Sequence, residues 1–425
     1  MGVVPSSLRM RWAVAAGAAF LLAGASPGSA AGVSVYSETI LRSFERATPR
    51  GAEADVAPLY EYLRVDAGRT RRWGPSLHLY GWARSDLADS RLFEENPDGE
   101  LLYAFLQFDT PLQNVSARLG RQYVFDGVAN ESVDGVRLSG DLTGSLGASV
   151  YAGLPVAVEE RAGRGGDRIL GGRLSLHRSS LYDLGVSYKY LQSDGDRDEE
   201  VLGIDLSARL PWGVSVQGYS TANLVTDGWG EHSYEVSAPA GPVRVTLSAH
   251  RYDYAHLFNR GDNSAQPFRG LSGTGNELWV LGARAVWWTA GGWELAATAR
   301  RYDSGARADD GTYYGVLASW NPRGPLQVGG ELAWMDGDLD KSRYLLGRAF
   351  GYVEFARIHL AGDLVLERYG GDISGEDTAL TASLGAARRF WGESLEVRLS
   401  TDYRSNPEFD SDWRTMAVAR YWLER

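Results

Sequence analysis

The stretch EVLGIDLSARLPWGVSVQGY, residues 200–219, decides the fold that we predict for this chain. Every second residue from Leu202 to Leu210 is apolar, and the residues between them, such as Asp205 and Arg209, are small, polar or charged. Alternation with a period of two is typical of a β-strand with one apolar and one polar face. A turn at residues 211–213 leads into a second alternating segment, so the stretch is predicted to be a β-hairpin.

The same unit of strand, turn and strand recurs to the end of the chain. In residues 277–288, Trp279 and Trp287 bracket small apolar residues on one face, and the segment is long enough to cross the apolar band of an outer-membrane barrel. Charges lie opposite the apolar face in nearly every strand, which favours a barrel over a soluble β-sandwich. We therefore predict an all-β fold, a transmembrane antiparallel β-barrel of about 22 strands (range about 18–22).

The connections between the predicted strands alternate in length. Short ones lie at residues 109–114, 210–213, 238–242, 289–292, 321–325 and 355–357, and long or charged ones at 86–99, 155–167, 193–199, 253–275, 303–310, 335–341 and 369–376. Outer-membrane barrels have short periplasmic turns and longer external loops. The parity of this alternation requires one more strand before residue 59, and residues 33–46 are the only candidate, although their alternation is weak.

The beginning of the chain predicts export. Arg9 and Arg11 precede a short apolar run that ends in small residues, which indicates a cleaved signal peptide at residues 1–30 and a single barrel domain at 31–425. The chain has no cysteine, which excludes disulfides and Cys-ligated metals, and its net charge of −11 argues against a nucleic-acid partner. We expect the protein in the outer membrane of a Gram-negative bacterium, with the lipid bilayer and lipopolysaccharide as partners.

Charged residues on the polar faces are the candidates for the wall of the lumen. They include both signs, which predicts a mixed, charged wall that screens solutes or, as the plainer alternative, ordinary cross-strand ion pairs. The predicted pore-lining residues are Arg118, Arg137, Arg173, Asp205, Arg209, Arg244, Arg284, Arg300, Glu331, Asp363, Glu396, Arg398 and Asp402.

The longest connection, residues 253–275, is the candidate constriction, because no segment is long enough to form a separate plug domain. Its charged residues and aromatics suit a loop folded into the lumen. The predicted constriction residues are His256, Arg260, Asp262 and Arg269.

Signals for other chemistry are weak. The acidic repeat at residues 194–198 lacks the glycine of a calcium loop, and the histidines do not have metal-binding spacing. His232 and Ser233 are adjacent, but neighbours on a strand point to opposite faces. We expect no enzyme activity, no metal site and no cofactor.

One hairpin carries a resemblance to known families. Residues 117–138, ARLGRQYVFDGVANESVDGVRL, resemble the paired strands of phosphate-selective and alginate-export porins, in which inward basic residues favour anionic solutes. The matching basic positions are Arg118, Arg121 and Arg137. More loosely, the chain is similar to the large barrels of metal-reducing bacteria that enclose a multihaem cytochrome and form an electron conduit.

The pattern and the resemblance together predict a porin-like channel for the passive passage of small hydrophilic solutes or ions. The alternative is a barrel that forms a sheath around a multihaem cytochrome. A wide lumen would suit either function.

Overall fold

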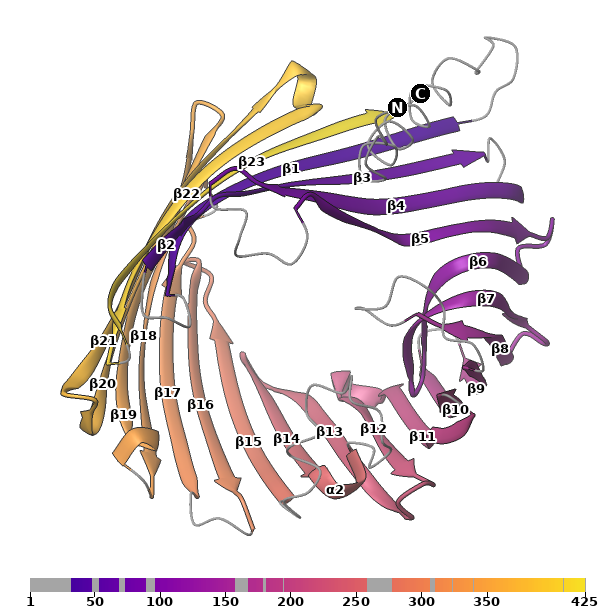
Figure 1. Cartoon of the computed structure of the whole chain (residues 1–425). Helices are drawn as coiled ribbons and strands as arrows, with labels where there is room; N and C mark the ends of the chain where they lie inside the picture. Colours follow the sequence, from indigo (N-terminus) through magenta and orange to yellow (C-terminus); the bar gives the residue numbers. More distant parts are fainter. Residues whose placement is uncertain are drawn as a thin grey trace, which may run out of the picture.

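The computed structural model describes residues 32–47, 53–68, 73–88, 96–156, 167–178, 181–193, 195–257, 277–305, 310–322, 324–338, 340–407 and 409–424. Within them the chain is almost entirely β-structure, and Figure 1 shows the strands following one another around a wide ring. The strands are β1 (Gly32–Ala47), β2 (Glu53–Val56), β3 (Pro58–Gly68), β4 (Gly74–Asp86), β5 (Asp98–Asp109), β6 (Val115–Asp126), β7 (Ala129–Asp141), β8 (Leu146–Pro155), β9 (Arg168–Arg178), β10 (Tyr182–Ser193), β11 (Asp196–Arg209), β12 (Ser215–Asn223), β13 (Gly228–Ala240), β14 (Val243–Asp253), β15 (Glu277–Trp288), β16 (Trp293–Asp303), β17 (Gly311–Trp320), β18 (Leu326–Gly337), β19 (Tyr344–Phe355), β20 (Ile358–Ile373), β21 (Glu376–Phe390), β22 (Leu395–Asn406) and β23 (Phe409–Glu424).

The helical segments within these described residues are short: α2 (Tyr254–Leu257) and the 3₁₀ turns η2 (Pro211–Gly213), η3 (Asp340–Ser342) and η4 (Trp391–Glu393). No helix in the part of the chain that the structure describes is long and apolar enough to cross a bilayer.

The sheet is closed because its first and last long strands pair with each other. β1 pairs antiparallel with β23 along one edge and with β3 along the other. β2 pairs with the end of β1 alone among the described strands, so twenty-two strands make up the ring. The prediction of a closed antiparallel barrel of about 22 strands is confirmed. Since the number is even, β1 begins and β23 ends at the same end of the barrel, which we call the terminal end; the opposite end is the loop end.

The strand inferred from parity at residues 33–46 is confirmed as β1. Its alternation is weak because polar side chains occupy its outer face. Ser37 Oγ donates a hydrogen bond to Glu61 Oε1 of β3 at 2.6 Å, and Thr39 Oγ1 donates one to Glu61 Oε2 at 2.5 Å. Hydroxyl groups bonded to one carboxylate therefore replace the apolar residues that the pattern required.

The predicted alternation of short and long connections holds only in part. At the loop end, β6 and β7 are joined by Gly127 and Val128 alone, and β20 and β21 by Ser374 and Gly375. The connection predicted at residues 193–199 is also shorter than expected, because β10 ends at Ser193 and β11 begins at Asp196. A run of polar residues marks the end of the apolar stretch of a strand. The strand itself can extend further, because the hydrogen bonds between paired strands come from the backbone and need no apolar side chains.

The register assigns every side chain to the inside or the outside of the ring. The inner face is the one on which side chains of strands that are not neighbours meet: Lys189 Nζ of β10 lies 2.9 Å from Glu131 Oε1 of β7. The opposite face exposes large apolar side chains, such as Leu247, Leu281 and Leu332, each more than half exposed. These side chains would contact lipid in a membrane.

Aromatic side chains gather near both ends of the outer face, as in the interfacial girdles of membrane barrels. Those towards the loop end are Tyr123, Phe125, Trp279 and Trp413, and those towards the terminal end are Phe108, Trp287, Trp293 and Phe355.

Candidate functional site

The charged residues predicted to line a lumen share the inner face. Cross-strand partners point to the same side of a sheet, so the register links them strand by strand, as in Arg118↔Arg137 and Glu331↔Arg348. The structure places on this face Arg118, Arg137, Arg173, Asp205, Arg209, Arg244, Arg284, Arg300, Glu331, Asp363, Glu396, Arg398 and Asp402.

Acidic side chains neutralise the charge of several arginines on this face through ion pairs. Arg173 of β9 contacts Asp183, and its Nε donates a hydrogen bond to Asp205 Oδ2 of β11 at 3.0 Å. Arg348 of β19 binds Asp363 of β20 through two nitrogens, with Nε 2.9 Å from Oδ2. Charge-assisted, bidentate contacts of this kind hold both side chains against the wall. The inner surface is therefore a fixed pattern of dipoles in these places rather than a row of free cations.

The ion pair between Arg173 and Asp205 spans a whole strand, and a glycine on that strand makes it possible. Arg173 and Asp205 belong to strands that flank β10, so their contact passes over Gly185. A Cβ at Gly185 would lie 2.4 Å from Arg173 Nε and 2.4 Å from Asp205 Oδ2, closer than any real contact. The glycine is needed for space rather than for its backbone conformation.

Towards the terminal end of β11, β14 and β15, the lumen is lined by arginines whose positive charge has little or no acidic partner. Arg209 and Arg244 have no acidic partner within 4.0 Å among the described residues, and Arg284 has only Glu294, at 3.9 Å. Arg284 is half exposed. This part of the wall therefore presents net positive charge to the lumen.

On β6 to β10 the inner face is packed rather than open. Inward side chains at the loop end of these strands form an apolar cluster: Val124, Ala129, Val133, Tyr151, Ile169 and Leu191, each less than 9% exposed. Beside them Lys189, 8% exposed, lies between the carboxylates of Glu131 and Glu199. Apolar residues at positions where the other strands carry charges were the sequence signal for this cluster, and the sequence prediction missed it.

The turn between β6 and β7 is fixed to the wall beside this cluster. The backbone N–H of Val128 donates a hydrogen bond to Ser187 Oγ of β10 at 3.1 Å. Gly127 has φ +58°, and a Cβ there would lie 2.2 Å from Ser187 Oγ. Both the backbone conformation and the close approach require glycine. The β6–β7 hairpin therefore leans inward and occupies part of the ring.

A second inward feature that the sequence prediction missed is a continuous series of aromatic rings on β3, β4 and β5. Each ring contacts the next, with centroids 4.8 to 6.3 Å apart. We call this series the aromatic ladder; in order of contact it consists of Trp82, Tyr60, Tyr62, Tyr80, Tyr103, Phe105 and His78. Aromatic residues at alternate positions in each of these three strands were the signal that could have revealed it.

The predicted constriction loop is described only at its start. His256 lies in α2, where its Nδ1 is 2.9 Å from Thr226 Oγ1 and its carbonyl accepts a hydrogen bond from Asn223 Nδ2 at 3.0 Å. The start of the loop is thus attached to the β12–β13 turn. The other predicted residues, Arg260, Asp262 and Arg269, lie outside the described residues, so the constriction remains a prediction.

The hairpin that carries the porin resemblance has basic residues on both faces. Arg118 and Arg137 point inward, where Arg137 Nε lies 2.7 Å from Asp126 Oδ2. Arg121 belongs to the opposite face, where its Nε lies 2.8 Å from Asp134 Oδ1. Arg121 is three positions after Arg118 on the strand, and an odd offset puts two side chains on opposite faces, so the two cannot line the same pore.

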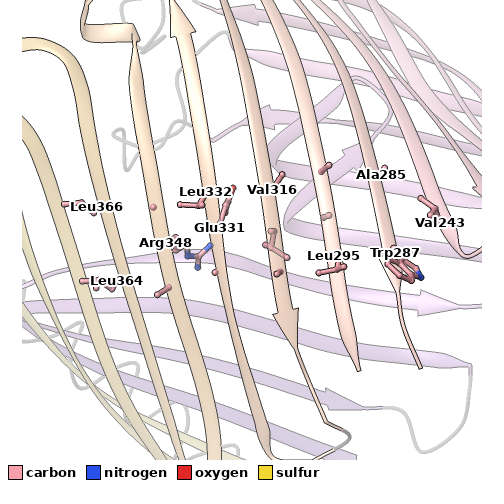
Figure 2. Close-up of a pocket in the computed structure, with 17 residues that line it drawn as sticks. Val243, Ala285, Trp287, Leu295, Val316, Glu331, Leu332, Arg348, Leu364 and Leu366 are labelled. Carbon is pink, nitrogen blue, oxygen red and sulfur yellow. The ribbon is translucent and has the colours of Figure 1, made fainter. Parts of the chain in front are cut away.

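A hollow of about 860 Å³ lies on the outer face of β14 to β20 (Figure 2). It forms where small outward residues such as Ala285 and Gly347 adjoin larger ones such as Trp287, Val316 and Leu332. Glu331 and Arg348 also contribute to its lining, but most of the lining is apolar and it lies on the outside of the ring, so we do not count it as part of the solute site.

No protein-family model matches the chain, and no curated protein matches it. Solved structures are similar over 93% of the chain. OccAB2 of Acinetobacter baumannii has a TM-score of 0.47 and 11% identity over 98% of its own length; OpdQ of Pseudomonas aeruginosa has 0.45 and 10% over 97%. A BenF-like porin from Pseudomonas fluorescens Pf-5 has 0.44 and 11% over 98%. These scores assign neither a family nor a function to the chain.

Among the described residues, no group of three or more His, Asp or Glu side chains converges as metal ligands would.

Proposed function

We propose that this chain is an outer-membrane channel through which small hydrophilic solutes or ions pass passively. The observation that carries the proposal is the division of one closed sheet into two faces. The outer face exposes leucine, valine and tryptophan, and the inner face carries the charged residues predicted to line a pore. A closed ring with an apolar outside and a polar inside is the arrangement that spans an outer membrane and encloses water.

The outer face supports the bilayer and lipopolysaccharide as partners. Between the two aromatic girdles it is mostly apolar, and at the level of the loop-end girdle it carries arginines: Arg251 pairs with Trp279, and Arg301 pairs with Leu281, the next outward position. Lipopolysaccharide presents phosphate groups at this level, and guanidinium groups bind phosphate well. We propose accordingly that the loop end faces the outside of the cell and that the signal peptide at residues 1–30 is removed on export.

The width of the open lumen bears on the choice between channel and cytochrome sheath. Twenty-two strands alone would enclose a wide bore. The packed cluster on β6 to β10 and the inward β6–β7 hairpin take up part of it. This supports a narrowed channel, whereas a sheath needs its bore free for a protein partner.

A specific solute type receives less support than the channel itself. Inward Arg118 and Arg137 agree with the resemblance to phosphate-selective or alginate-export porins, but Arg121 points away from the lumen. Several other inward arginines are ion-paired. We therefore propose passage of small hydrophilic solutes generally, with the pore-lining residues acting as a charged screen.

Ion conductance of the purified protein in planar bilayers tests the proposal. Discrete current steps of a narrow channel are expected. Deleting residues 259–272 should raise the conductance if residues 253–275 constrict the lumen, as we propose. A very large conductance that the deletion leaves unchanged would contradict the constriction and favour the sheath, and no conductance at all would contradict the channel.

A further inference from the structure

The aromatic ladder forms one connected surface along the inside of the wall. Tyr60 pairs with Arg84 across β3 and β4, and Phe105 pairs with His78 across β4 and β5, so the ladder covers about six residue positions of β4. At about 3.3 Å per residue this is roughly 20 Å along the strand. That length approaches the height of the apolar band of a membrane barrel, about 25 Å. The rings therefore line much of the path between the two ends.

The tyrosines in the first part of the ladder adjoin sideways, whereas His78 and Phe105 stack with their centroids 4.8 Å apart. Tyr60 and Tyr62 have planes 18° apart with centroids separated by 6.3 Å, and Tyr62 and Tyr80 have planes 27° apart at the same separation. Nearly parallel rings at that distance are strongly offset, so each keeps part of its face free. All the rings of the ladder are partly exposed. Because the ladder is on the inner face, the free ring surface faces the lumen.

The polar groups beside the ladder are largely neutralised. Arg84 Nη2 lies 3.1 Å from Asp98 Oδ2, and Arg64 Nε lies 3.0 Å from Asp66 Oδ2. His78 Nδ1 lies 2.6 Å from the other oxygen of Asp66. These pairs supply hydrogen-bond donors and acceptors next to the rings without a strong net charge.

We propose that the ladder binds saccharides and guides them along the lumen; the proposal rests on the channel function proposed above. A sugar ring has apolar C–H faces and hydroxyl groups around its edge. The faces fit the exposed aromatic rings, and the hydroxyls fit the tyrosine hydroxyls and the paired arginine and aspartate groups. Several weak, similar contacts in series allow a molecule to be held and still move on, which conduction requires.

A small aromatic anion is the competing ligand for such a surface. It would also stack on the rings, but its carboxylate would need a cation free to bind it. Arg64 and Arg84 are already engaged by aspartates. Arg118 Nε donates to Gln107 Oε1 at 3.0 Å while the guanidinium lies 5.2 Å from the centre of the Phe105 ring. One further guanidinium, that of Arg42, lies 5.8 Å from the centre of the Tyr60 ring near the loop end of the ladder and could bind a carboxylate there. Along the rest of the ladder the paired charges favour a neutral, hydroxyl-rich ligand.

The test uses the full-length protein in planar bilayers with maltohexaose as the probe. Maltohexaose should interrupt the ion current in a concentration-dependent way. The double variant Tyr80→Ala/Tyr103→Ala, which breaks the ladder at its centre, should need about tenfold more sugar for the same effect. Tyr314→Ala is the matched control, because Tyr314 is a half-exposed tyrosine on the outer face and should leave the sugar response unchanged.

A second measurement separates the ladder from the channel. In detergent solution maltohexaose should change the tryptophan fluorescence of the protein, and Trp82→Phe should reduce that change while keeping a ring in place. If the protein conducts ions but maltohexaose affects neither current nor fluorescence, the saccharide proposal is wrong and the channel stands. If benzoate interrupts the current and maltohexaose does not, the ladder binds aromatic anions instead. If the protein does not conduct, the channel is wrong, and the fluorescence titration decides the ladder.

Discussion

Replacement of Ala283 by arginine tests the assignment of the two faces. Ala283 is an exposed residue on the outer face of β15, midway between Trp279 and Trp287, with Leu247 of β14 and Ala299 of β16 as its cross-strand partners. In a membrane this position lies near the middle of the apolar band. An arginine there should lower the free energy of unfolding by about 2–4 kcal/mol, because its charge must leave water for hydrocarbon.

Arg284, the next residue along the strand, provides the comparison. Its side chain is half exposed on the inner face, and its acidic partner, Glu294, is 3.9 Å away. A loose, solvated ion pair contributes about 0–1 kcal/mol, so Arg284→Ala should be nearly neutral. The loss in free energy of unfolding is thus expected to be several-fold larger for Ala283→Arg than for Arg284→Ala.

Urea-induced unfolding in lipid vesicles measures both costs, with gel mobility of unheated samples reporting the folded fraction. Ala283→Leu is the control for side-chain size and should not destabilise the barrel. Leu295→Arg, on the outer face beside Trp287, should cost only about 0–1 kcal/mol because charge is tolerated near the interface. Equal costs for Ala283→Arg and Arg284→Ala, or a larger cost for the second, would refute the assigned faces.

Other substitutions test the inward packing and the orientation. Gly127→Ala should destabilise the barrel by about 1–3 kcal/mol, since it combines a positive φ with a Cβ 2.2 Å from Ser187 Oγ, and Ser187→Gly should recover part of the loss in the same unfolding assay. Lys189→Met should cost about 3–5 kcal/mol by leaving carboxylates without their cation, and adding Glu131→Gln should reduce that cost; no loss of stability would show that the ion pairs are absent. Ser374→Cys, in the β20–β21 turn, should react with a membrane-impermeant maleimide on intact cells, whereas labelling of a cysteine in the β11–β12 connection instead would invert the orientation.

The sequence by itself determined the barrel and its two faces. Successive side chains on a β-strand point to opposite faces, so alternation such as that from Leu202 to Leu210 predicts both the strand and the side on which each residue lies. Parity even located β1, where hydroxyl residues bonded to Glu61 hide the pattern. The candidate lumen residues, from Arg118 to Asp402, could be assigned to one face because this periodicity is local.

Only the tertiary structure decided what occupies the inside. The contacts of Val128 with Ser187 and of Lys189 with Glu131 join strands that are far apart in the chain, and no local pattern encodes such a meeting. The aromatic ladder likewise depends on the register that places Tyr80 beside Tyr103. Alternation specifies which face a residue takes, but closure of the ring and the offset between strands determine which inward side chains touch. The character of the lumen is therefore a property of the whole barrel and not of its strands.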